Sequence, residues 1–66
     1  MKLIMKTEFD NLRVNQNYSY DTDTNSDKQV VKIYCNELLI AKKIKLKKSI
    51  RYFAIQGYQQ YLTDED

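Results

Sequence analysis

The N-terminal part of the chain alternates apolar and polar residues with the two-residue period of a half-buried strand. One side of the first segment would carry Leu3, Met5, Thr7 and Phe9, and the other Lys2, Ile4, Lys6 and Glu8. Residues 14–20 repeat the alternation, and Asp10 and Asn11 have turn chemistry between the two segments. We therefore predict two strands here. A helix over residues 3–12 is the alternative, with Met5, Phe9 and Leu12 on one side.

The middle of the chain predicts two further strands. Residues 21–27 are polar throughout and are interpreted as a loop. Residues 30–35 are apolar on both faces, which is typical of a buried, central strand, and Asn36 with Glu37 can turn the chain. Residues 38–47 then alternate, except that Lys42 falls on the apolar side. The apolar side of this last strand has Ile40, Ile44 and Leu46, and the opposite side has Ala41, Lys43, Lys45 and Lys47.

From Ser49 onward the apolar spacing changes to three and four, which predicts an amphipathic helix over residues 49–62 with Ser49 as its cap. Its apolar stripe would contain Ile50, Phe53, Ala54, Tyr58, Tyr61 and Leu62. Gly57 lies on the same stripe and would allow a close approach to the sheet. The predicted fold is a single α+β domain of residues 1–62: a small antiparallel sheet of three or four meandering strands with one C-terminal amphipathic helix packed on a face. Residues 63–66 are expected to form a frayed acidic tail.

With 66 residues, the chain can form only a thin core. It has no histidine, and Cys35 is its single cysteine, so neither a zinc site nor a disulfide is expected to stabilise it. Cys35 is interpreted as a small buried hydrophobic residue. The apolar N-terminal stretch is too short for a signal peptide, which favours a cytoplasmic protein. The abundance of lysine, asparagine, isoleucine and tyrosine suggests AT-rich coding DNA and a phage or mobile-element origin.

Charge is segregated along the sequence. Residues 8–27 carry five acids and one base, whereas residues 28–51 carry eight bases and one acid. Six of the eleven basic residues lie between Lys42 and Arg51, where the predicted strand passes into the predicted helix. This basic ridge, together with two neighbouring apolar side chains, is the candidate binding site. Its residues are Lys43, Lys45, Lys47, Lys48, Arg51, Tyr52 and Ile55.

No complete catalytic or cofactor motif is present. Asp21, Asp23, Asn25 and Asp27 repeat the first ligand positions of a calcium loop, but Ser26 and Lys32 stand where that loop needs glycine and glutamate. Every acid falls in a predicted loop, turn, exposed position or tail, so no pair is expected to do general acid–base chemistry. We therefore expect a protein that is not an enzyme and that binds no metal or cofactor.

The leading functional hypothesis is a small binding protein that inhibits or modulates a larger protein or nucleoprotein complex by occupying part of its surface. The alternative is a DNA- or RNA-binding regulator that contacts phosphates through the basic ridge. The lysines could also serve only to keep the surface soluble, and the tyrosines could only cover the core. A homodimer, formed through an open sheet edge or the aromatic face of the helix, is compatible with either hypothesis.

Overall fold

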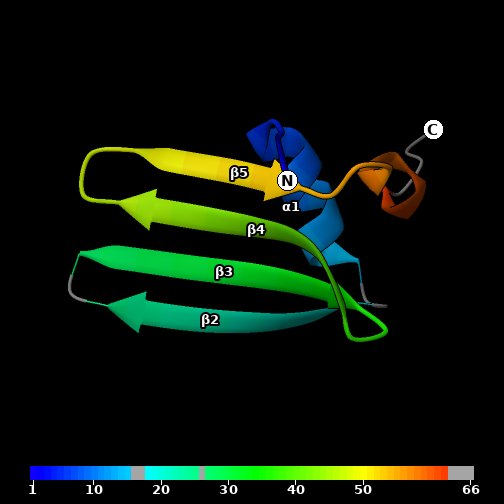
Figure 1. The fold of residues 1–66 in the computed structure, drawn as a ribbon, viewed down its shortest axis with the longest axis horizontal. Coiled ribbons are helices and arrows are strands. Elements are labelled where there is room, and N and C mark those ends of the chain that lie inside the picture. Colours follow the sequence, from blue (N-terminus) through cyan, green and yellow to red (C-terminus); the bar gives the residue numbers. More distant parts are fainter. Residues whose placement is uncertain (16–17, 26, 63–66) are drawn as a thin grey trace.

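The computed structural model describes residues 1–15, 18–25 and 27–62, which form an antiparallel sheet with one α-helix on it (Figure 1). The predicted acidic tail, residues 63–66, lies outside the described residues. Along the chain the elements are β1 (Lys2–Leu3), α1 (Lys6–Val14), β2 (Ser19–Asn25), β3 (Lys28–Cys35), β4 (Leu38–Leu46), β5 (Ile50–Ala54) and a single 3-10 turn, η1 (Tyr58–Tyr61). The sheet has five strands, and not the predicted three or four, in the order β1-β5-β4-β3-β2. Figure 1 shows α1 across one end of the sheet, with the strands extending well beyond it.

The predicted N-terminal strands are wrong, because residues 6–14 form α1. Phe9 and Leu12 are fully buried against the sheet, as the alternative helical interpretation required, whereas Met5 is exposed. In a helix, residues three apart lie on the same face, so both Phe9 and Leu12 contact the sheet; in a strand they would point to opposite faces. The predicted strand over residues 14–20 is wrong at its start, because Val14 ends the helix, whereas Ser19 and Tyr20 belong to β2; residues 16 and 17 lie outside the described residues.

The predicted C-terminal helix is also wrong, because Ile50–Ala54 is the strand β5 and pairs with β4. The apolar residues of this segment fit either period, since they occupy adjacent as well as alternate positions. The strand β5 pairs with β4 on one side, and its C-terminal residues also pair with β1 on the other side. Ala54, at the end of β5, is completely buried in this arrangement. Gly57 then adopts a φ of 83°, a left-handed conformation that favours glycine and separates β5 from η1.

The polar loop predicted over residues 21–27 is wrong, because residues 21–25 belong to β2 and pair with β3, while residue 26 lies outside the described residues. Their polar side chains are compatible with a strand because β2 lies at the edge of the sheet, where both Asp21 and Asp23 are exposed. Charged side chains on an edge strand also discourage pairing with other chains.

The two strands in the middle of the chain are confirmed, as β3 and β4, and so is the turn between them. Asn36 and Glu37 both have positive φ, the conformation of a tight hairpin turn. The central strand is β4 and not the predicted residues 30–35. A register shift opposite Ile33 and Tyr34 makes Ile40 an extra residue of β4, and both Ile40 and Ala41 are fully buried.

The core lies between α1, the adjacent half of the sheet and η1. Its buried residues are Ile4, Phe9, Leu12, Ile33, Ile40, Ala41, Ala54 and Tyr58. Two hydrogen bonds attach the C-terminal turn: the Tyr58 hydroxyl donates to Glu8 of α1, and the Tyr18 hydroxyl donates to the carbonyl oxygen of Tyr61 at 2.9 Å. Within the described ranges, no helix has the length and apolar character that crossing a membrane requires.

Candidate functional site

The strand register decides on which face of the sheet each predicted site residue lies. Tyr52 lies on the helix side, because its ring is 5.3 Å from that of Phe9 in α1. Lys43 is paired with Tyr52 and its ammonium nitrogen is 6.0 Å from the centre of that ring, so it shares this side. Lys45, two residues further along β4, also points to the helix side.

The other predicted residues lie elsewhere. Arg51 is adjacent to Tyr52 in β5 and therefore points to the opposite face. Lys47 and Lys48 lie in the turn between β4 and β5, which the backbone hydrogen bond from Leu46 to Ser49 closes at 2.7 Å. Ile55 follows β5 and is half-buried against the core. Because the helix from Ser49 does not exist, there is no strand-to-helix ridge, and the basic residues are divided between two faces and a turn.

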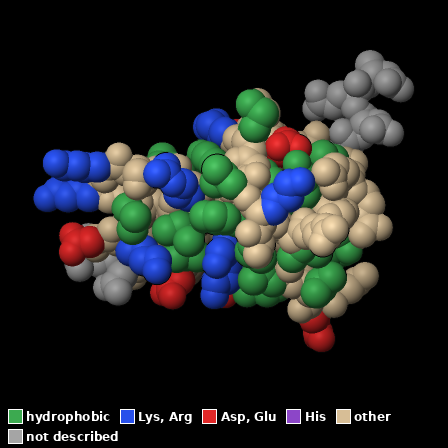
Figure 2. All heavy atoms as spheres, turned by 45° about the horizontal axis from the view of Figure 1, so that its top comes forward, with side chains coloured by type: hydrophobic (Ala, Val, Ile, Leu, Met, Phe, Trp, Pro, Cys, Tyr) green, Lys and Arg blue, Asp and Glu red, His purple; other side chains and the backbone are tan. Residues whose placement is uncertain are grey.

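Four lysines nevertheless gather at the end of the sheet that α1 leaves uncovered. This basic end consists of Lys28, Lys45, Lys47 and Lys48, which are all exposed. Figure 2 shows Lys and Arg side chains at the left-hand tip of the molecule, on the side where Figure 1 has the β4–β5 turn. Among the described residues, Lys6 and Asp10 of α1 form an ion pair at 2.7 Å, and no lysine of the basic end is paired with a described carboxylate.

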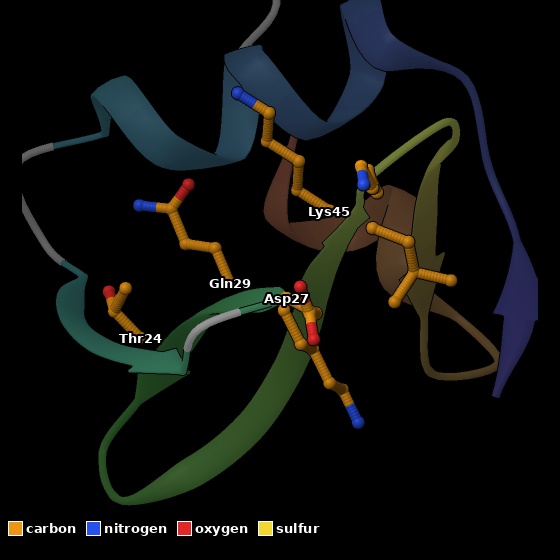
Figure 3. Close-up of a pocket in the computed structure, with 7 residues that line it drawn as sticks. Thr24, Asp27, Gln29 and Lys45 are labelled. Carbon is orange, nitrogen blue, oxygen red and sulfur yellow. The ribbon is translucent and has the colours of Figure 1, made fainter.

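A shallow hollow of about 360 Å³ lies at the basic end. Its lining contains three lysines and one acid: Thr24, Asp27, Lys28, Gln29, Lys45, Leu46 and Lys47. In Figure 3, Thr24, Gln29 and Lys45 project to the same side from three neighbouring strands, as their register requires. The lining thus offers cations together with neutral hydrogen-bonding groups, which suits an anionic group on a partner.

The face of the sheet opposite α1, which we call the open face, was not recognised as a candidate surface from the sequence. Its central apolar residues are Val30, Ile44 and Phe53, with Leu3, Tyr34, Leu39 and Leu46 around them. None of these residues is buried, and none belongs to the core cluster. In the part of the chain that the structure describes, no element covers this face.

The open face is also charged, with both signs in different places. Lys28, Lys32, Lys42 and Arg51 lie among the apolar residues, whereas Asp21 and Asp23 lie on the edge strand β2. The ammonium nitrogen of Lys42 is 5.8 Å from the centre of the Phe53 ring, which holds the lysine over the β5 side of the face. Figure 2 shows the resulting pattern of hydrophobic side chains between Lys and Arg side chains.

The titratable groups with resolved shifts lie away from both surfaces. The hydrogen bond from Tyr58 lowers the pKa of Glu8, and the same bond raises the pKa of Tyr58. Burial raises the pKa of the Tyr18 hydroxyl, and the neighbouring Cys35 and Tyr61 add to the effect. Within the described residues, no group of His, Cys, Asp or Glu side chains is placed to hold a metal ion. These contacts tie the two ends of the chain together and act on stability.

Comparison with family models, with curated proteins and with solved structures gives no match for this chain.

Proposed function

We propose that the protein is a small, non-enzymatic binding module that inhibits or modulates a larger protein or nucleoprotein assembly by attaching its basic end to an anionic part of that assembly. The observation that carries the proposal is the projection of Lys28, Lys45, Lys47 and Lys48 beyond α1. Exposed lysines of this kind attract an anionic partner and raise its rate of association. The proposal assigns no chemical step to the protein.

A protein partner is favoured over nucleic acid by the neighbours of the lysines. Tyr52, the aromatic residue closest to them in β5, packs against Phe9 and is not free to stack on a base. The basic end contains no arginine for reading base edges. Asp27 lies in the hollow beside Lys28 and would repel a continuous run of phosphates. A protein surface with a few carboxylates fits this mixture of lysine, amide and hydroxyl groups better.

The proposal is tested with a double variant of the β4–β5 turn, Lys47→Gln with Lys48→Gln. A matched control removes two exposed basic residues from the other end of the molecule, Lys2→Gln with Arg13→Gln. Immobilised wild type and both variants are incubated with nuclease-treated lysate of the source organism, and the retained proteins are compared. We expect the wild type and the control to retain the same partner, and the turn variant to bind it roughly 5- to 30-fold more weakly, at about 0.5–1 kcal/mol per exposed ion pair.

Equal retention by all three proteins would show that the basic end is not the contact surface. A partner that the wild type retains from untreated lysate but not from nuclease-treated lysate would instead support the nucleic-acid alternative. That alternative also requires direct binding of a random-sequence DNA oligonucleotide at low salt, weakening steeply as salt rises.

A further inference from the structure

The open face lacks the second layer that a sheet normally requires. A sheet that is apolar on one face is stable when that face packs on another element. Here α1 covers the helix side, while Val30, Ile44 and Phe53 on the other side remain outside the core. In the predicted fold, Ile44 belonged to the buried side of its strand. The structure turns this residue to the face without a helix, so something else is needed to bury it.

One row of side chains across the open face has a distinctive order. The strand register aligns Arg51 of β5, Ile44 of β4, Val30 of β3 and Asp23 of β2. The row thus has a cation at one end, two β-branched apolar residues in the middle and an anion at the other end. Arg51 and Asp23 are three strand spacings apart, roughly 14 Å, so they cannot pair within one chain.

We propose that the open face is the interface of a homodimer, with a two-fold axis that runs along the strands between β3 and β4. Such an axis places β4 over β3 of the second copy and β5 over β2 of the second copy. Arg51 then faces Asp23 of the second copy, Ile44 faces Val30, and the symmetry repeats both contacts. The row matches itself when it is reversed, with an apolar centre and charge pairs at the rim.

The neighbouring row fits this arrangement at its ends but not in its middle. It aligns Phe53, Lys42, Lys32 and Asp21. Because the Lys42 ammonium lies over the Phe53 ring, it is displaced toward β5, and β5 is where the axis brings Asp21 of the second copy. Near the axis, Lys32 faces Lys42 of the second copy, so both lysines have to extend their ammonium groups to the rim of the interface. This contact between like charges limits the affinity.

A second copy fits the open face better than an unrelated acidic partner, because the face carries its own acids on β2. A purely acidic surface would meet Asp21 and Asp23 with like charge. The molecule measures 37 Å by 22 Å across its two longer axes, which bounds the face at roughly the 800 Å² per partner of a standard interface. The sheet fills only part of this area, so we expect a dimer that dissociates on dilution.

The test is a charge exchange between Arg51 and Asp23, followed by light scattering of purified protein over a dilution series. The wild type is expected to approach twice its chain mass of 7.9 kDa at high concentration. Arg51→Asp puts two carboxylates together at each end of the interface, and Asp23→Arg puts two guanidinium groups together there. Each single variant should therefore weaken the dimer roughly a hundredfold, because like charges in an interface cost several kcal/mol.

Mixing the two single variants should restore association, because the heterodimer again has opposite charges at both ends. The double variant should dimerise as well. Recovery on mixing also shows that the single variants are folded. Lys45→Asp is the matched control: it reverses a charge on β4 but on the helix side, and it should stay dimeric.

A wild type with constant monomer mass at all concentrations would overturn the proposal. Single variants that dimerise like the wild type, or a mixture that does not recover, would do the same. The test uses no other protein, so its result is independent of the binding partner proposed for the basic end.

Discussion

At the scale of single residues, Glu8 joins parts of the chain that are far apart in sequence. Its Oε1 accepts the backbone N–H of Met5 at 3.1 Å, and its Oε2 accepts the hydroxyl of Tyr58. The first bond satisfies a free N–H at the start of α1, and the second fixes η1 to the helix. Both bonds favour the ionised carboxylate, and they lower the pKa of Glu8 below its ordinary value of 4.5.

The lowered pKa makes this contribution to stability dependent on pH. Since the pKa is lower in the folded protein, the contribution is complete above the ordinary value of 4.5 and is lost as pH falls through the folded value. Glu8→Gln should therefore lower the free energy of unfolding at pH 7, and the difference from wild type should shrink toward pH 3. Urea denaturation at several pH values measures both.

Glu37→Gln is the control, because Glu37 is an exposed carboxylate in the β3–β4 turn. It should change the free energy of unfolding little and to a similar extent at pH 3 and pH 7. A Glu8→Gln variant that loses the same stability at both pH values would show that the charge of Glu8 contributes nothing.

At the scale of elements, α1 and β5 exchange the roles that the sequence pattern predicts. The predicted C-terminal helix would have buried Ile50, whereas in the structure Ile50 is 41% exposed and Leu12 of α1 is fully buried. Leu12→Ala should therefore cost about 2–5 kcal/mol of unfolding free energy, through lost burial and a cavity. Ile50→Ala should cost less than about 1 kcal/mol.

Urea denaturation of the two variants measures the contrast. If Leu12→Ala is too unstable to fold, it should show no unfolding transition by circular dichroism, while Ile50→Ala should still show one. That result would also place Leu12, and not Ile50, in the core. A larger loss for Ile50→Ala than for Leu12→Ala would contradict the placement of the core.

The elements that can be predicted from the sequence are those whose pattern fits a strand and not a helix. Residues 30–35 are apolar on both faces and residues 38–47 alternate apart from Lys42, and the Asn36–Glu37 turn between them limits their length. Residues 3–12 fit both a strand and a helix, and only packing against the sheet selects the helix. Residues 50–54 are equally ambiguous, and pairing with β4 selects the strand. β2 has no apolar pattern at all, because an edge strand can expose both of its faces.

The candidate site was predictable to the same extent. The concentration of basic residues between Lys42 and Arg51 is a property of the sequence, and so is their alternation along one strand. The face on which each residue lies depends on β5 and on the extra residue in β4, which are not visible in the sequence pattern. The sequence pattern does not reveal the open face, because it places Ile44 and Leu46 on the side that a helix would cover.

At the scale of the whole molecule, the proposed two-fold axis has a consequence for the basic end. An axis parallel to the strands leaves the strand direction unchanged, so both copies point the same way. The two β4–β5 turns, each with Lys47 and Lys48, then lie at one end of the dimer, and both α1 helices lie at the other. Dimerisation would thereby double the positive charge offered to an anionic partner at one place, and binding through both copies would strengthen attachment.

This arrangement predicts that a monomeric variant binds anionic surfaces less tightly without any change in charge. Ile44→Asn places an amide at the centre of the open face and leaves the formal net charge of +2 per chain unaltered. Both proteins are loaded on a cation-exchange column at a concentration at which the wild type is dimeric. The wild type should then elute at higher salt than Ile44→Asn. Neutralising Lys47 and Lys48 in both backgrounds should remove most of this difference, because the two turns would no longer present paired charge. Elution of the wild type and Ile44→Asn at the same salt, with their masses shown to differ, would mean that the two basic ends do not act together.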